Sequence, residues 1–367
     1  MRTAPSLHQR AAQGMARHVS MPASNAAKTD SSRSGQVLLD SDRAKRWFVT
    51  GGAGFIGSHA VDLLVSAGCH VTVYDNLSLS TDQYVAAYAR DGKVTLHRAD
   101  LLNREYLKKA IVGHDIVWHL GANTDIPSGY TQRRIDLDNG VIATCNVLEA
   151  MVEAGIQDLL FASTGAVYGE SIQGIFREDS GPLIPLSLYG AGKLASEAFI
   201  SSYCNLFGIH AWIFRFGNVI GERTNHGVIH DFVKKLQKTP KQLEILGTGR
   251  GEKNYFLVEE CINGMLFTYH ATDGGPFPVL FNLGTMSTTK VMRIAEIIIE
   301  EMGLENVHYE FTGTQVGWPG DQPVVLLDTS KIRTLGWTVR RTSEEAVRAA
   351  ARRLLGKEKF RLTVETL

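Results

Sequence analysis

The feature that most constrains the fold is a set of three evenly spaced glycines that follows an apolar run. The run is 46–50, the glycines are Gly51, Gly54 and Gly57, and a helix-like pattern follows over 55–67. Glycine permits the tight turn at the first position, close approach of backbone N–H groups to a pyrophosphate at the second, and close helix–strand packing at the third. The positive end of the helix dipole then faces the phosphates. This strand–turn–helix predicts a dinucleotide site, with an ordinary strand–helix turn as the alternative.

A second apolar strand, 70–74, ends in an acidic residue, Asp75, which lies 24 residues after Gly51. This is close to the ~20-residue spacing at which an acidic side chain binds the adenosine ribose. A carboxylate there accepts hydrogen bonds from the ribose hydroxyls and repels a 2′-phosphate, so we expect NAD rather than NADP. The alternative for Asp75 is a turn residue at the end of a strand.

Strand-like and helix-like segments alternate from about residue 45. Apolar strands are expected at 46–50, 70–74, 94–97, 115–120, 157–163 and 210–215, and helices at 55–67, 82–90, 103–111, 138–154 and 189–207. This alternation indicates an α/β fold of the Rossmann type, in which a doubly wound parallel sheet is buried on both faces by helices. Ligands of such sheets bind outside the carboxyl ends of the strands.

Three parts of the chain are expected. Residues 45–216 form the NAD-binding Rossmann domain, and 217–367 form mainly a smaller substrate-binding lobe that interleaves with the sheet. Residues 1–44 contain no acidic residue before Asp30 and too little apolar surface to offset the entropy of ordering. We interpret them as a disordered N-terminal extension, with a targeting peptide or a start codon placed too early as alternatives. Helices of the second lobe are expected at 228–237, 258–271, 289–302 and 343–355.

Composition excludes several classes of function. The chain has 367 residues and balances 38 basic against 38 acidic side chains, which argues against nucleic acid as a partner. Its 4 cysteines lie far apart with no metal-ligand spacing, so we expect reduced thiols, no metal and a cytoplasmic location. The sequence has no apolar run of 18 residues, so no membrane span is expected.

A second informative segment contains Tyr189 and Lys193, which would lie on one face of a helix at the i, i+4 spacing. An ammonium beside a phenol favours the phenolate and lowers its pKa from ~10, so the tyrosine can exchange protons with a substrate hydroxyl near neutral pH. Thr164, at the end of a strand, offers a hydroxyl to orient the reacting oxygen, and the adjacent Ser163 is the alternative for that role. A solvated helix face is the simpler interpretation of a tyrosine–lysine pair alone.

Taken together and in this order, these motifs resemble the extended short-chain dehydrogenase/reductase family, and within it the nucleotide-sugar epimerases and dehydratases. The likeness runs from about residue 45 to about residue 355, and it is greatest to UDP-sugar 4-epimerases of the UDP-glucose type. The motifs that carry it are Thr50–Gly57, Asp75, His119–Ala122, Ser163–Gly169 and Tyr189–Lys193.

The resemblance implies that NAD takes part in epimerisation at C4 of a nucleotide sugar through a transient 4-keto intermediate. Tyr189 would take the proton of the 4-hydroxyl, and Lys193 would hold the nicotinamide ribose. The expected catalytic residues are Thr164, Tyr189 and Lys193. The expected cofactor-binding residues are Gly51, Gly54, Phe55, Ile56, Gly57, Asp75, Asn76, Asp100, Leu101, Leu120, Gly121, Ala122, Ser163, Tyr189 and Lys193.

The resemblance also implies which residues contact the substrate, and these are Thr164, Tyr168, Asn218 and Lys253. Asn218 matches a residue near the diphosphate, with a turn-forming asparagine as the alternative. Lys253 stands where family members usually carry arginine and can pair with phosphate only as a point charge. Tyr168 lies where an aromatic residue often simply packs.

Three departures limit the resemblance. Gly165 and Ala166 stand where many 4,6-dehydratases carry an Asp–Glu pair, and neither can transfer protons, which argues against dehydratase activity. Trp318 stands where a basic residue near the diphosphate is expected, and Gly140 where many members carry a cofactor-contacting asparagine. A UDP-glucuronate decarboxylase or another nucleotide-sugar reductase is therefore the main alternative, and a non-catalytic NAD-binding regulator is a remote one. A homodimer that pairs the helices 138–154 and 189–207 is also expected.

Overall fold

The structure is a computed structural model that describes residues 40–170, 175–272, 277–313, 320, 322 and 324–363. All of them belong to one compact unit, Gln36–Leu367. Most of the expected extension, residues 1–39, and also Trp318 lie outside the described residues. In the described part of the chain, none of the helices combines the length and apolar character needed to span a bilayer.

The folded part begins before the predicted boundary at residue 45. Helix α2 (Asp40–Ala44) precedes the first strand. The Asp42 carbonyl accepts a hydrogen bond from Trp47 Nε1 at 3.2 Å, and the Asp42 carboxylate pairs with His270 Nε2 at 3.0 Å. Residues 40–44, which fall within the expected extension 1–44, thus form a helix, and Asp42 in that helix is buried.

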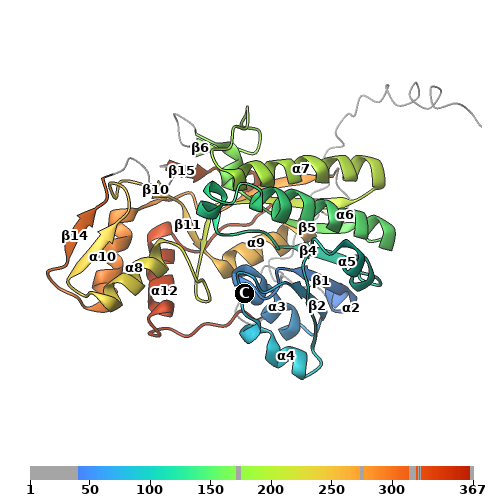
Figure 1. The fold of residues 1–367 in the computed structure, drawn as a ribbon, viewed down its shortest axis with the longest axis horizontal. Helices are drawn as coiled ribbons and strands as arrows, with labels where there is room; N and C mark the ends of the chain where they lie inside the picture. Colours follow the sequence, from blue (N-terminus) through green and yellow to red (C-terminus); the bar gives the residue numbers. More distant parts are fainter. Residues whose placement is uncertain are drawn as a thin grey trace, which may run out of the picture. The chain divides into compact units, whose positions relative to one another are not determined.

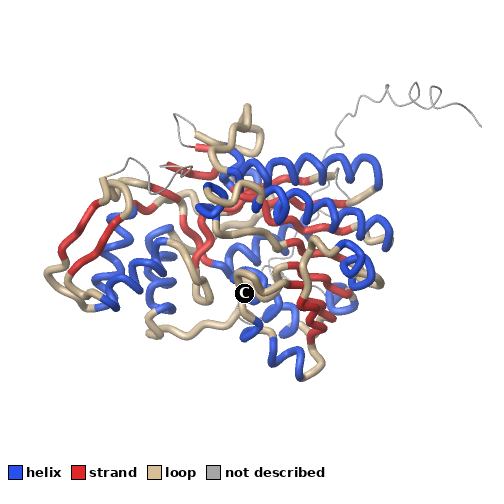
Figure 2. Tube along the Cα trace, viewed as in Figure 1, coloured by secondary structure: helices blue, strands red, loops and turns tan. Residues whose placement is uncertain are grey.

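A seven-stranded parallel sheet, in the order β12-β7-β5-β4-β1-β2-β3, forms the centre of the fold (Figures 1 and 2). Its first six strands in chain order lie within one residue of the predicted ones. The seventh, β12, comes from the second part of the chain and pairs in parallel with β7. The strands are β1 (Arg46–Thr50), β2 (His70–Asp75), β3 (Val94–Arg98), β4 (Ile116–His119), β5 (Asp158–Thr164), β7 (His210–Phe216) and β12 (Val279–Leu283).

Helices cover both faces of this sheet, because its strands are apolar on both faces. Trp47 and Val49 pack with α3 (Phe55–Ser66) and α9 (Val258–Ala271). Phe48 points the other way and packs with residues of α5 (Arg104–Ala110), α6 (Ala143–Ala154) and α7 (Leu188–Phe207). The expected helix 82–90 is divided into η2 (Asp82–Tyr84) and α4 (Ala86–Arg90), and the expected helix 138–154 begins as a π-helical segment, η4 (Leu137–Ile142).

The second part of the chain builds its own core from three amphipathic helices, α8 (Val228–Lys238), α10 (Val291–Met302) and α12 (Ser343–Leu354). Short strands lie outside the large sheet, and the pairing of β6 with β15 joins the first part of the chain to the second. They are β6 (Ile175–Phe176), β8 (Asn218–Ile220), β9 (Gln242–Ile245), β10 (Glu252–Lys253), β11 (Tyr255–Leu257), β13 (Thr289–Lys290), β14 (His308–Phe311) and β15 (Val324–Leu327). The sequence pattern predicted none of these strands, because segments of two to four residues carry too little periodicity.

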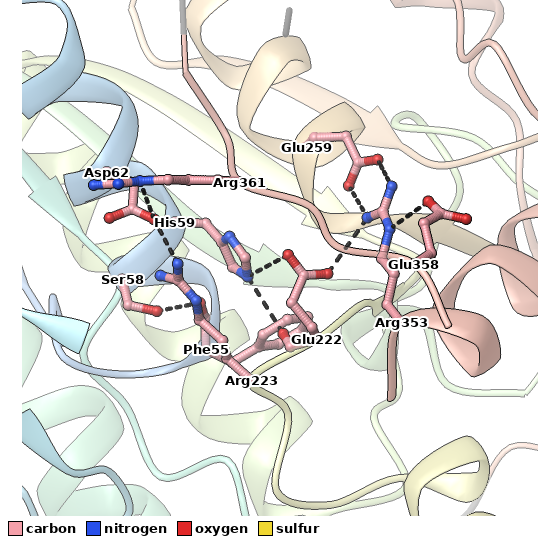
Figure 3. Close-up of polar contacts among 10 residues, drawn as sticks. All are labelled: Phe55, Ser58, His59, Asp62, Glu222, Arg223, Glu259, Arg353, Glu358 and Arg361. Atoms are coloured by element: carbon pink, nitrogen blue, oxygen red, sulfur yellow. Dashed lines mark hydrogen bonds and ion pairs between the residues drawn. The ribbon is translucent and has the colours of Figure 1, made fainter. Parts of the chain in front are cut away.

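A cluster of charged side chains ties α3 to the second part of the chain (Figure 3). Arg223, in the loop after β8, pairs with Asp62 of α3 at 2.5 Å. Arg353 of α12 pairs with Glu259 of α9 at 2.8 Å and with Glu222 at 3.4 Å. The helix that begins in the glycine-rich turn is thus anchored at its side to the lobe that follows the sheet.

Candidate functional site

The glycine-rich turn lies at the carboxyl end of β1 and is packed backbone against backbone. Gly51 has a φ of +66°, and a Cβ built on it would lie 2.7 Å from the Gly121 nitrogen. A Cβ on Gly57 would lie 2.1 Å from the Gly51 carbonyl oxygen. Because no other residue fits either position, the turn holds the first N–H groups of α3, from Phe55 and Ile56 onward, at the edge of the sheet. This cradle fits the pyrophosphate of a dinucleotide.

Asp75 ends β2 beside this turn and is largely buried. Its Oδ2 accepts a hydrogen bond from the Ala53 backbone N–H at 3.0 Å, and its Oδ1 accepts from Leu77 N–H at 2.8 Å and from Ser80 Oγ at 3.1 Å. The carboxylate therefore braces the glycine-rich turn against the end of the next strand. A ribose hydroxyl that binds here would share these oxygens with the protein's own donors.

The remaining residues expected at the adenosine end lie together. The Asn76 side chain donates to Asp100 Oδ2 at 2.8 Å, and Asp100 Oδ1 accepts from Leu102 N–H at 2.8 Å. Leu101 contacts Gly121, since a Cβ on that glycine would lie 3.0 Å from a Leu101 methyl carbon. The structure thus brings the ends of β2, β3 and β4 to one edge, as parallel strands require.

A buried chain of hydrogen bonds orients the end of β4. The Gly121 N–H donates to Thr50 Oγ1 at 3.1 Å, Thr50 Oγ1 lies 2.6 Å from His119 Nδ1, and His119 Nε2 lies 3.1 Å from Thr144 Oγ1. Thr144 itself donates to the Gly140 carbonyl at 2.6 Å. The donors can therefore all be satisfied only if the histidine carries its proton on Nε2. Burial lowers the pKa of His119 to about 3, so the ring is neutral. Leu120 and Ala122 flank Gly121 on the same edge.

Tyr189 lies in the first turn of α7, where its phenol shares a hydrogen bond with the Thr164 hydroxyl at the end of β5. The Ser187 hydroxyl caps this helix by accepting a hydrogen bond from Gly190 N–H at 3.1 Å. The cap fixes the start of the helix and therefore the position of Tyr189 in its first turn. The Thr164 hydroxyl also accepts from Ala166 N–H at 3.1 Å. The phenol and the hydroxyl named by the sequence are thus in contact.

Lys193 lies one turn further along α7 and is 4% exposed. Its Nζ donates to the Ala162 carbonyl at 2.7 Å and lies 4.7 Å from the centre of the Phe161 ring. Burial lowers the Lys193 pKa to about 8. Burial also raises the pKa of Tyr189 to about 12. The expected lowering of the phenol pKa is therefore wrong for this structure, because burial disfavours the phenolate and the ammonium is bonded to a backbone carbonyl.

Ser163 and Tyr168 belong to a buried network below the site. The Ser163 hydroxyl donates to Glu197, and Arg215 binds Glu197 with both ends of its guanidinium, at 3.0 and 2.6 Å. Tyr168 is 3% exposed and donates its hydroxyl hydrogen to Asn282 Oδ1 at 2.7 Å. The polar atoms of Ser163 and Tyr168 are thus engaged by Glu197 and Asn282, and their contacts with a ligand stay predictions.

Asn218 lies in β8, and Lys253 ends β10 two residues before β11, the strand that pairs with β8. Asn218 begins β8 and donates from Nδ2 to the Asn254 carbonyl at 3.3 Å, next to Lys253 in the chain. Both are half-buried. Pairing of β8 with β11 therefore places the two residues expected at the diphosphate in one region. The Trp318 position lies outside the described residues.

Sequence reasoning missed Asn123 and Asp136, which are both buried near α7. Asn123 follows β4 and donates to Asp136 Oδ1 at 3.0 Å. An aspartate within a polar stretch carries no local signal of burial, and only the packing of η3 (Ile126–Tyr130) and α7 around it shows its place. No group of side chains in the described ranges could hold a metal ion, and the four cysteines are free thiols.

Comparison with known proteins agrees with this geometry. The model of the NAD dependent epimerase/dehydratase family matches residues 47–284. A Methanocaldococcus jannaschii protein provisionally named UDP-glucose 4-epimerase is 31% identical over 297 residues, which cover 79% of this chain and 92% of that protein. Two further relatives, each 28% identical, carry other names. They are a dTDP-D-glucose 4,6-dehydratase of Mus musculus, matched over 83% of this chain and 87% of that protein, and UDP-glucuronic acid decarboxylase 1 of Xenopus tropicalis, matched over 73% and 62%.

Solved structures give the same result. A UDP-galactose 4-epimerase is 34% identical with a TM-score of 0.75 and covers 86% of this chain and 100% of its own. The complex of Thermus thermophilus UDP-glucose 4-epimerase with NAD is 28% identical with a TM-score of 0.74, and covers 85% of this chain and 100% of its own. The backbone that forms the glycine-rich cradle here thus belongs to an architecture in which NAD is bound.

Proposed function

Because this chain belongs to the NAD-dependent epimerase/dehydratase family, whose members act on nucleotide sugars, we propose that it is a 4-epimerase of a UDP-linked sugar. Its cofactor is NAD. The observation that carries the proposal is the contact of the Tyr189 phenol with Thr164 at the end of β5, with Lys193 one turn away. In the sheet, β5 is next to β4, and β4 is next to β1 with its glycine-rich turn, so these groups share one edge.

In this proposal Tyr189 takes the proton from the sugar 4-hydroxyl, and Thr164 orients that hydroxyl by hydrogen bonding. Bound NAD supplies the reversible oxidation of the sugar carbon. Lys193 stabilises the phenolate by its charge, which requires its Nζ to leave the Ala162 carbonyl and turn toward the phenol. After the 4-keto sugar has turned its other face to the nicotinamide ring, Tyr189 returns the proton to the sugar O4, so the chain regains its starting state.

The diphosphate is assigned to Asn218 of β8 and to Lys253, which ends β10 just before β11, the strand that pairs with β8. An amide and a primary amine there supply hydrogen-bond donors and one positive charge for a doubly charged group. This assignment favours a substrate whose diphosphate is held partly by backbone groups.

The residues after Thr164 argue against elimination of water from the sugar. A dehydratase needs groups that transfer protons at C5 and C6, and η5 (Gly165–Tyr168) begins with Gly165 and Ala166. A Cβ on Gly165 would lie 3.1 Å from the Phe216 carbonyl oxygen, so a side chain there would be tightly packed. We therefore propose an epimerase rather than a dehydratase.

Incubation of the purified chain with UDP-, dTDP-, CDP- and GDP-sugars, without added cofactor, tests the proposal. We expect the C4 epimer of a UDP-sugar, because NAD is regenerated in each cycle. Accumulation of a 4-keto product, or release of CO2 from UDP-glucuronate, would contradict it, and the second outcome would identify a decarboxylase. Binding of NAD without turnover of any sugar would favour a regulator.

We also propose that two copies of the chain form a dimer through α6 and α7. The outer side of α7 exposes Phe199 at 45% and Leu206 at 68%, beside the exposed Phe207. Val152 on α6 is also exposed. A second copy of the same two helices would cover this apolar surface by isologous packing.

A further inference from the structure

A buried carboxylate that the proposed mechanism does not use lies beside α7. Asp136 is 3% exposed and directly precedes η4. A Cβ on Gly192 of α7 would lie 2.9 Å from the Asp136 carbonyl oxygen and 3.7 Å from its Cβ, and a Cβ on Gly129 of η3 would lie 2.6 Å from its Oδ2. The side chain is therefore enclosed between two glycines, one of which is the neighbour of Lys193.

Only one of the two carboxylate oxygens is satisfied. Asp136 Oδ1 accepts from Asn123 Nδ2 at 3.0 Å, whereas Oδ2 has no hydrogen-bond partner among the residues that the structure describes. A buried carboxylate with a free oxygen is costly, so its charged form is favoured only where a cation lies nearby. Burial raises the Asp136 pKa and the charge of Asp125 raises it further, while the Asn123 hydrogen bond and the Lys193 ammonium lower it.

The titratable and polar groups that face the proposed catalytic pair come from several parts of the chain. Around Lys193 they are Glu197 of the same helix, Asp136 and the neutral His119 of β4. Around Tyr189 they are Asp136, which raises the phenol pKa, and the uncharged Thr164, which lowers it. Glu197 is already paired with Arg215 at 2.6 Å. Asp136 is thus the anion near the pair whose charge no arginine of the described chain neutralises.

We propose that Asp136 is a positioning residue for the Tyr189–Lys193 pair. Its negative charge keeps the buried Lys193 side chain an ammonium ion, which is the form in which Lys193 can stabilise the Tyr189 phenolate. No bond to Asp136 forms or breaks, and the residue acts only through its charge. The inference rests on the proposed function for the roles of Tyr189 and Lys193, but its physical content can be measured without a substrate.

Replacement of Asp136 by asparagine, Asp136→Asn, keeps the shape and the bond to Asn123 and removes the charge. Without the anion, Lys193 loses its proton at lower pH and Tyr189 becomes more acidic, so both limbs of the pH profile of kcat/KM move to lower pH. We expect a shift of at least about 0.5 pH units on each limb, since a charge within several ångströms moves a pKa by this much or more. If kcat/KM falls at every pH while both limbs stay at their original pH, the role of Asp136 is merely structural and the proposal is overturned.

Ultraviolet titration of the phenol gives a second readout that needs no turnover. The absorbance of Asp136→Asn minus that of the double variant Asp136→Asn/Tyr189→Phe gives the titration of Tyr189 alone. The native chain and Tyr189→Phe give the same difference with Asp136 in place. We expect Tyr189 to ionise at lower pH once Asp136 is replaced, and an unchanged midpoint would overturn the proposal. If the native chain turns over no nucleotide sugar but this shift is present, the proposed function fails while Asp136 retains its effect.

Asp138→Asn is the matched control, because Asp138 carries the same group two residues away, half-exposed and paired with Arg134 at 3.0 Å. It should leave both readouts unchanged, and an equal shift there would show a non-specific charge effect. Asn123→Ala provides a second variant should Asp136→Asn fold poorly. Loss of the Asn123 hydrogen bond makes Asp136 easier to protonate, so we expect a smaller shift in the same direction, and no shift would count against the proposal.

Discussion

At the scale of single residues, some side chains of the site form hydrogen bonds within the protein, whereas others face the place assigned to the substrate. Ser163 is used by Glu197, and Lys193 is used by a backbone carbonyl. Thr164 and Tyr189 contact each other at the end of β5. The Ser163 hydroxyl donates its hydrogen to the buried Glu197, whereas the Thr164 hydroxyl faces Tyr189, so Thr164 is preferred to Ser163 as the orienting hydroxyl.

Tyr189→Phe removes the group assigned to proton transfer and little else. We expect kcat to fall by about 10²–10⁴-fold, the usual contribution of general acid–base catalysis, while NAD stays bound. Tyr203→Phe on the same helix is the control and should keep full turnover. The rates are measured as epimer formed per unit time, and bound NAD is measured by its release on denaturation. Equal activity of the two variants would exclude the role of Tyr189.

Gly57→Ala tests the glycine-rich turn. Its new Cβ would meet the Gly51 carbonyl oxygen at 2.1 Å, so the turn must move away from α3. We expect a loss of about 1–3 kcal/mol of stability from overpacking and at least tenfold weaker NAD binding. Gly140→Ala is the control, because its Cβ would have its closest contact at 3.9 Å. Chemical denaturation and a binding titration measure both quantities, and unaltered NAD binding by Gly57→Ala would contradict the assignment.

At the scale of elements, helices from distant parts of the chain are held together by charged side chains as well as by apolar packing. Arg353 of α12 lies between Glu222, Glu259 of α9 and Glu358 (Figure 3). Its guanidinium also lies over the Phe360 ring, 4.0 Å from the ring centre. Burial raises the Glu222 pKa, and the charge of Arg353 lowers it. The arginine therefore keeps a group of carboxylates ionised that would otherwise repel one another.

Arg353→Met leaves these carboxylates without their cation. We expect a loss of about 3 kcal/mol of stability near neutral pH, the usual cost of removing one partner of a buried pair. In the variant the folded-state pKa of Glu222 rises because the Arg353 charge is lost, so protonation below that pKa relieves the repulsion and the deficit shrinks as pH falls. Urea denaturation of the native and variant chains at pH 8 and pH 5.5 measures this. A deficit that grows on acidification would contradict the explanation.

At the scale of the whole molecule, the second part of the chain completes the sheet of the first. Strand β12 pairs with β7, and the glycine-bearing helix α3 is anchored to α12 through charged groups. The sequence pattern changes at the expected boundary, residue 216, but the large sheet does not end there. The chain returns to that sheet at Val279, where β12 begins. Residues that could contact a sugar nucleotide come from both parts.

The proposed dimer predicts that a chain of 40.3 kDa has twice this mass in solution. Replacing Phe199 and Leu206 together by glutamate should yield monomers, since two charges would be buried against a second copy. Replacement of the exposed Leu246, which lies away from α7, by glutamate is the control. Light scattering after size-exclusion chromatography measures the mass. A native monomer, or a dimer that survives the double substitution, would exclude this interface.

Much of the architecture could be predicted locally. Apolar runs predicted six strands of the large sheet, because a strand buried on both faces must be apolar throughout. Glycine spacing and a strand-end acid predicted the NAD site, because only glycine permits the contacts of Gly51 and Gly57. The order of motifs predicted the family. In each case the signal lies within a few consecutive residues.

What the sequence determined by itself was therefore the class of fold, the cofactor and the candidate residues for proton transfer. The tertiary structure decided which of those residues have free polar atoms, and which unremarked residues stand beside them. It buried Tyr168, engaged Ser163, enclosed Asp136 and reversed the expected direction of the Tyr189 pKa shift. Burial and long-range charge depend on segments far apart in the chain, so no local pattern could have shown them.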